Sequence, residues 1–123
     1  MSDSLQRRAY VQAVLVAYLE LPETPSRPRP PDRHLAGQLH QHQVPLSTVR
    51  DALLLATARR LLRPEQAPRL SPIRSLYYFA PVIEEIQQRP LPAGYSDYLK
   101  RKIALHLTRP RQSPSPEPGS PSA

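Results

Sequence analysis

The stretch DRHLAGQLHQHQVPLSTVRDALLLATARR, residues 32–60, decides the fold that the sequence predicts. Its apolar residues first recur at helical spacing over 32–41, a segment for which Asp32 is a good N-cap. A short polar turn follows over 40–44, and a second helical pattern then begins. The sequence therefore predicts two consecutive helices joined by a tight turn.

The second of these helices is expected to run to about Arg63, where Pro64 stops it. Either Pro45 occupies its first turn or Ser47 caps it. One strip of this helix carries Leu46, Val49, Leu53, Ala56 and Arg60. The apolar members of the strip predict that the helix buries one face.

The pattern of small and branched residues in this stretch resembles the helix-turn-helix of bacterial DNA-binding domains. Ala36 stands where the two helices cross, Val44 marks the turn, and Val49 follows as the residue that packs inward. The spacing from Ala36 to Val44 is about three residues longer than in the tightest versions of the motif, and no glycine stands at the turn. The segment QVPLSTVRDAL still resembles a turn followed by a recognition helix.

This resemblance implies that the start of the second helix reads base edges in the DNA major groove. The residues at this edge are Gln43, Ser47, Thr48, Arg50 and Asp51. Three later arginines, Arg59, Arg60 and Arg63, are expected to hold phosphates. A DNA-binding protein should present Arg50 and these three arginines on one open side. The alternative, a helical protein–protein interaction module, should bury part of that side.

A second resemblance concerns the residues that follow. The order of elements resembles that of the winged-helix replication initiators of phages, plasmids and other mobile elements. In this order a helix-turn-helix is followed by a polar stretch and then by the segment PIRSLYYFAPVIEEI. The residues that match the last helix of those proteins are Ile73, Tyr78, Phe79 and Ile83. A minimal wing would occupy 61–70, and the chain shows no origin-nicking or ATPase element. The resemblance therefore implies an accessory factor in replication or regulation.

The charge of the chain favours a polyanionic partner. The net charge is +7, and residues 22–63 hold seven arginines against three acidic residues. Such clustering indicates nucleic acid first and an anionic membrane second. Because 15 of the 17 basic residues are arginine, the codon bias of a GC-rich genome would give the same composition without any binding role.

Two further basic segments are candidates for contact with nucleic acid. The segment PETPSRPRPP, residues 22–31, holds five prolines and predicts an extended arm. This arm either lies along phosphates or in a minor groove, or is a stiff linker. The last helix, predicted over 96–107, either binds phosphates or faces solvent on its basic side. The basic candidates in and beside these segments are Arg27, Arg29, Arg33, Lys100, Arg101 and Lys102.

The rest of the chain completes an all-α domain over residues 1–107, followed by a disordered Pro/Ser tail over 108–123. A first helix over 4–21 is expected to bury a broad apolar face that includes Leu5, Ala9, Ala13 and Val16. A helix that begins at Ser71 is expected to kink or restart at Pro81.

Two local features accompany this outline. The aromatic run 77–79 is expected to anchor the core. A short strand over 69–73 is the one candidate for β structure that the sequence offers. Neither feature changes the predicted class.

The sequence argues against catalysis and against bound cofactors. It has no cysteine, no glycine-rich phosphate loop, and no pattern that pairs a nucleophile with a base or two carboxylates. His34, His40 and His42 lie close in sequence, but their spacing and the lack of further ligands disfavour a metal site. The apolar run 10–21 is too short to span a bilayer, and a cytoplasmic protein is expected. The expected partner is double-stranded DNA, or else a protein that includes a second copy of the chain.

Overall fold

The computed structural model describes residues 2–108, and the predicted all-α class is confirmed. Within these residues there is no strand, so the candidate strand over 69–73 is not formed and the loop over 62–75 has no wing. Thr108 ends the last helix, and the predicted disorder of 109–123 lies outside the described residues. The elements in chain order are α1 (Ser2–Leu19), α2 (Pro30–Gln41), α3 (Leu46–Leu61), η1 (a 3₁₀ helix, Leu76–Phe79), α4 (Ala80–Gln88) and α5 (Tyr95–Thr108).

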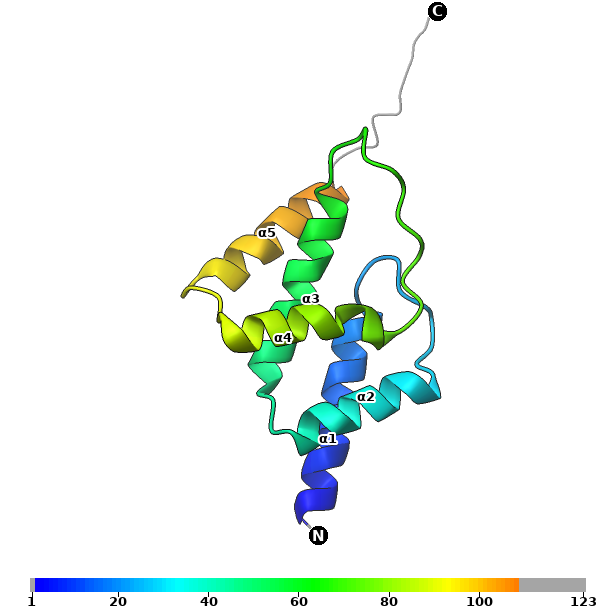
Figure 1. Cartoon of the computed structure of the whole chain (residues 1–123), viewed down its shortest axis with the longest axis vertical. Coiled ribbons are helices and arrows are strands. Elements are labelled where there is room, and N and C mark those ends of the chain that lie inside the picture. Colours follow the sequence, from blue (N-terminus) through cyan, green and yellow to red (C-terminus); the bar gives the residue numbers. More distant parts are fainter. Residues whose placement is uncertain (1, 109–123) are drawn as a thin grey trace, which may run out of the picture.

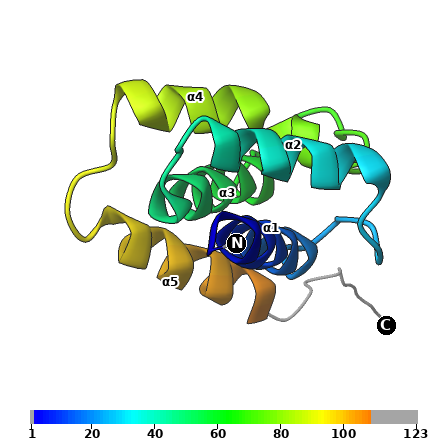
Figure 2. The same cartoon turned by 90° about the horizontal axis from the view of Figure 1, so that it is seen from below.

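Helix α3 occupies the centre of the molecule (Figure 1). It packs against α1, α4, α5 and η1. Seen from below, α1 and α3 lie in the middle, with α2 and α4 on one side and α5 on the other (Figure 2). Eight of the 16 residues of α3 are buried. The helix to which the sequence assigned DNA contacts is thus also the helix around which the fold is built.

The buried face of α1 differs from the expected one. Val14, Leu15 and Tyr18 are buried, whereas Leu5 is 66% exposed and Val16 is 44% exposed. The first turns of α1 extend beyond α2, so their apolar residues have no neighbouring helix to pack against (Figure 1). Helical spacing gave the correct helix, but it could not show which side of the helix the other elements cover.

At the start of α2 two predictions are wrong, namely the extended arm up to residue 31 and the N-cap at Asp32. Pro30 and Pro31 form the first turn of the helix, where a missing N–H costs nothing, rather than the end of an extended arm. Asp32 is therefore the third residue of α2 and not its N-cap. Its buried carboxylate accepts the N–H of Arg29 and the N–H of Leu76, both at 2.8 Å. Asp32 thus fastens α2 to η1.

The aromatic run 77–79 is only partly in the core. Phe79 is buried and meets the ring of Tyr18 at 5.9 Å, whereas Tyr77 and Tyr78 are exposed. The cause is the 3₁₀ helix, in which residues three apart share one side, so that Leu76 and Phe79 point inward together. The helix expected from Ser71 does not form, while the restart near Pro81 is confirmed because α4 begins at Ala80.

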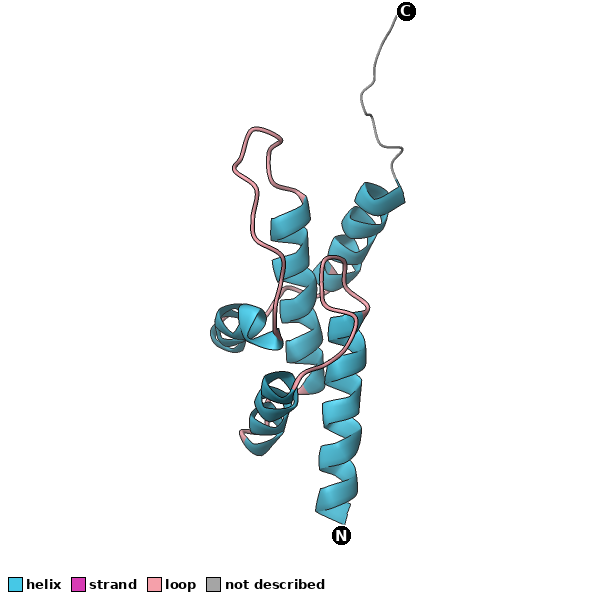
Figure 3. Ribbon diagram, turned by 90° about the vertical axis from the view of Figure 1, so that its right-hand side faces the viewer, coloured by secondary structure: helices cyan, strands magenta, loops and turns pink. Residues whose placement is uncertain are grey.

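Helix α5 closes the side of α3 opposite α4. Leu99 and Ile103 are buried against the core, as their spacing predicts. Leu107, the third member of that stripe, is 54% exposed. The last turns of α5 lean away from α3, which explains why the stripe is only partly buried (Figure 3).

Candidate nucleic-acid interface

The turn between α2 and α3 is rigid although it lacks glycine. The amide of Gln43 donates to the carbonyl of His40 at 2.9 Å, and the amide of Val44 donates to the carbonyl of Leu39 at 3.0 Å. These two bonds, with Leu39 and Val44 both buried, form the Schellman motif that ends many helices. Gln43 has φ 59°, the left-handed region that glycine usually occupies. The backbone therefore turns sharply at Gln43 and enters α3 in a fixed direction.

Helix α1 holds this turn in place. The hydroxyl of Tyr10 donates to the carbonyl of Val44 at 2.7 Å. The Tyr10 ring also meets the His40 ring edge to face at 5.2 Å. One side chain of α1 thus fixes both the end of α2 and the turn.

Alkaline pH is expected to destabilise the fold through two tyrosines. Burial raises the pKa of Tyr10 to about 12, and burial, aided by the charge of Asp32, raises the pKa of Tyr18 to about 12. Between pH 10 and 12 the unfolded chain loses tyrosine protons that the folded chain retains, so the free energy of unfolding falls as pH rises. Ultraviolet absorbance of tyrosinate, measured together with circular dichroism, should show part of the ionisation coinciding with unfolding.

Tyr18→Phe provides the test variant for this prediction. The Tyr18 hydroxyl is buried without a hydrogen-bond partner among the described residues. Its removal should therefore raise the alkaline midpoint and leave the neutral-pH fold at least as stable. Tyr98→Phe, which changes an exposed ring, is the matched control. A midpoint that Tyr18→Phe does not move would contradict the role of burial.

The three marker residues of the helix-turn-helix pattern are buried, as the sequence predicts. Ala36 and Val49 are completely buried and Val44 is 4% exposed. Helix α2 packs against α1 and η1 and not across α3, so Ala36 does not mark a close crossing of α2 and α3. The residues between Ala36 and Val44 are the end of α2, which continues to Gln41, and the Schellman turn that follows it.

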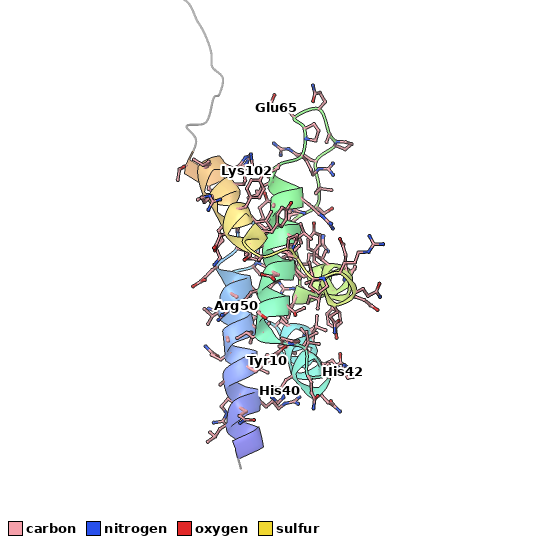
Figure 4. All side chains as sticks on the ribbon, turned by 90° about the vertical axis from the view of Figure 1, so that its left-hand side faces the viewer. Tyr10, His40, His42, Arg50, Glu65 and Lys102 are labelled. Carbon is pink, nitrogen blue, oxygen red and sulfur yellow. The ribbon has the colours of Figure 1, made fainter. Side chains whose placement is uncertain are left out.

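The start of α3 remains accessible to a ligand. Gln43, Ser47 and Arg50 are exposed, and Thr48 and Asp51 are half-buried. His40 and His42 lie toward the end of the molecule where α1 begins, Lys102 lies toward the other end, and Arg50 lies between them (Figure 4). The predicted base-contacting edge is therefore open, although α3 as a whole is central.

The later arginines of α3 form contacts within the protein and are not part of the accessible edge at the start of the helix. Both terminal nitrogens of Arg59 donate to the carboxylate of Glu85, at 2.9 and 2.6 Å. This hydrogen bond from Arg59 lowers the pKa of Glu85 and raises that of Arg59. Arg63 is exposed and donates to the carbonyl of Pro68 at 2.9 Å. These contacts fasten α3 to α4 and to the 62–75 loop.

Arg60 is an internal residue. Its side chain is only 5% exposed, its Nε donates to Glu23 at 2.7 Å, and a terminal nitrogen donates to the carbonyl of Ser71. The guanidinium also lies 5.5 Å from the ring centre of Tyr78. Burial alone would lower the pKa of Arg60, but hydrogen bonds with Tyr78 and Glu23 outweigh it and raise the pKa. The guanidinium is occupied within the fold, so Arg60 is not available for the phosphate that the sequence assigned to it.

The proline-rich segment is a loop with turns rather than an extended arm. Glu23 has φ 67°, and the hydroxyl of Thr24 donates to the carbonyl of Leu21 at 2.8 Å. Its arginines, Arg27 and Arg29, are exposed, as is Arg33 in α2. Contact of these three with nucleic acid stays a prediction.

The basic residues of α5 are separate from the turn. Lys100, Arg101 and Lys102 are all exposed. They lie on a helix that packs on the side of the molecule away from α2 (Figure 2). The basic residues of α5 and the turn therefore do not belong to one flat surface that a single ligand could cover.

Two arginines of α1 that sequence reasoning missed are candidates for contact with nucleic acid, and one of them lies beside the turn. Arg7 and Arg8 are exposed on α1, and Arg7 lines a shallow groove together with Gln43 and Pro45. The available signal was the absence of any acidic residue over 4–19 and again over 33–50.

No family model, curated protein or solved structure matches this chain. Among residues 2–108, the histidine, aspartate and glutamate side chains do not gather in threes close enough to hold a metal ion. In the same part of the chain, none of the helices is sufficiently long and apolar to cross a membrane.

Proposed function

We propose that the chain binds double-stranded DNA through the end of the molecule formed by the first half of α1, by α2 and by the start of α3. The observation that carries the proposal is the charge of this end. Residues 4–19 and 33–50 contain four arginines and three histidines but no aspartate or glutamate. Exposed guanidinium groups in segments without acidic residues attract the phosphates of a duplex, and the neighbouring carboxylates of Asp32 and Asp51 are buried and half-buried.

The open edge at the turn supports a role in base recognition. Arg50 projects from α3 one turn after Ser47, and both are exposed. An arginine can donate two hydrogen bonds to guanine, and serine can bond either a base or a phosphate. A regulatory or replication accessory role suits a protein that contacts DNA through such an edge.

Salt dependence tests the proposal directly. If Arg50 neutralises one phosphate and Arg7, Arg8 and Arg33 together neutralise one to three, raising salt from 50 to 200 mM should weaken binding roughly 12- to 150-fold. Fluorescence anisotropy with a labelled mixed-sequence duplex would measure this. A folded sample that does not bind the duplex at low salt would exclude the proposal.

Arg50→Ala tests whether Arg50 contributes to base preference or only to the attraction between the protein and DNA phosphates. It should reduce the preference for one base pair by about 1–3 kcal/mol, measured by site selection followed by titration of single-base variants. Arg59→Ala is the control on the same helix, because Arg59 is already bound to Glu85. Equal effects of the two substitutions on base preference would remove Arg50 from the recognition role.

A second candidate function, protein binding, is favoured by the opposite end of the molecule. Leu62, Leu70 and Tyr78 are each more than 40% exposed there. Leu70 and Tyr78 line a hollow with Val82, beside the end of α3. This surface is separate from the turn, so a protein could bind there while DNA is bound. Light scattering on the full chain would show whether a second copy occupies it.

A further inference from the structure

Gly37 stands in the interior of α2, where glycine is the least favourable residue after proline. A β-carbon at this position would lie 2.4 Å from a terminal nitrogen of Arg7, and the three nearest atoms all belong to the Arg7 guanidinium. Gly37 is buried because Arg7 covers it. Because Gly37 has no side chain, the Arg7 guanidinium can lie across α2 at this position.

Two further arginines line the same hollow as Arg7. Arg7 and Arg8 of α1 line one hollow with Arg33 of α2, and the other residues of the lining are Ser4, Val11 and Gln12. None of the six carries a carboxylate, and none of the three arginines forms a salt bridge with a side chain of residues 4–108. Like charges that line one hollow repel one another, and an anion bound among them would relieve that repulsion.

We propose that Arg7, Arg8 and Arg33 form a binding site for one phosphate group, and that Gly37 keeps Arg7 in the position this site requires. The inference rests on the proposed function in one respect, since the phosphate is taken to be that of a DNA backbone. Guanidinium groups match the oxygens of a phosphate in pairs, which favours this anion over chloride. The site would set the register of the duplex across α1 and α2, next to the edge that contains Arg50.

Gly37→Ala separates the loss of helix stability that the glycine causes from its role in anion binding. The alanine should raise Tm by roughly 4 °C in chloride, because it favours the helix and displaces only a flexible arginine tip. It should also weaken anion binding, because Arg7 can no longer lie across α2. A more stable protein that binds phosphate less well is the expected result.

The first measurement uses pyrophosphate and sodium chloride at equal ionic strength, with Tm as the readout. Pyrophosphate should raise the Tm of the wild-type chain by several degrees more than chloride does. Gly37→Ala and Arg7→Gln should abolish most of this difference, whereas Arg89→Gln, which removes an exposed arginine outside the hollow, should preserve it. Equal stabilisation of all four proteins would overturn the proposal.

The second measurement repeats the duplex titrations with these proteins. Gly37→Ala and Arg7→Gln should weaken duplex binding about three- to tenfold and reduce the salt slope by about one. If Arg50→Ala weakens duplex binding while Gly37→Ala and Arg7→Gln do not, the phosphate site is wrong and the proposed function stands. If the wild-type chain responds to pyrophosphate but binds no duplex, the proposed function is wrong and the site takes a free phosphate ester.

Discussion

Replacing Asp32 by alanine is expected to lower the free energy of unfolding by about 3 kcal/mol. The Asp32 carboxylate is fully buried and accepts the N–H groups of Arg29 and Leu76. Alanine removes both acceptors and leaves the N–H of Leu76, a completely buried residue, without a partner. Urea unfolding followed by circular dichroism would measure the loss, which is a large part of the roughly 5–15 kcal/mol that stabilises a typical domain.

Asp97→Ala provides a matched control, because Asp97 is the third residue of α5 just as Asp32 is the third residue of α2. Asp97 is exposed, so its loss should change stability by no more than about 1 kcal/mol. Asp32→Asn, which keeps the shape and one acceptor, should give an intermediate loss. If Asp32→Ala costs no more than Asp97→Ala, the buried carboxylate does not hold α2 to η1.

The sequence predicted the helices well because their signals are local. Leu35, Ala36 and Leu39 have the spacing of one helical face, and all three are buried. Prolines also marked several boundaries correctly. The predictions failed where the outcome depends on distant parts of the chain. Leu5 and Leu107 have the spacing of buried residues but project where no other element reaches.

The candidate site was predictable in part for the same reason. Gln43, Ser47 and Arg50 follow a recognisable turn, and the structure leaves them exposed. Arg7 and Arg8 were not found, because their relation to Arg33 and Gly37 exists only once α1 crosses α2. A cation on a helix becomes part of a site through its neighbours, and spacing along one helix does not reveal them.

Replacing Arg60 by alanine is expected to lower the free energy of unfolding by about 2–3 kcal/mol without weakening DNA binding by the folded protein. Arg60 ties α3 to Glu23, 37 residues earlier, and to the carbonyl of Ser71, 11 residues later. Alanine leaves that carbonyl without its donor. The cost stays below that of a fully buried ion pair because Glu23 is 47% exposed and can be solvated again. Urea unfolding and duplex titration on the same preparation would measure both quantities.

Two variants make the Arg60 prediction specific. Arg60→Met keeps the apolar stem and removes the hydrogen bonds, so it should recover part of the loss that comes from packing. Arg59→Ala removes the neighbouring guanidinium, which is 53% exposed, and should change stability little. Arg60 is also the last member of the apolar strip of α3 in the sequence, one turn after the buried Ala56. If Arg60→Ala instead weakens duplex binding and leaves unfolding unchanged, Arg60 contacts phosphate and its contacts with Glu23 and Ser71 contribute nothing to stability.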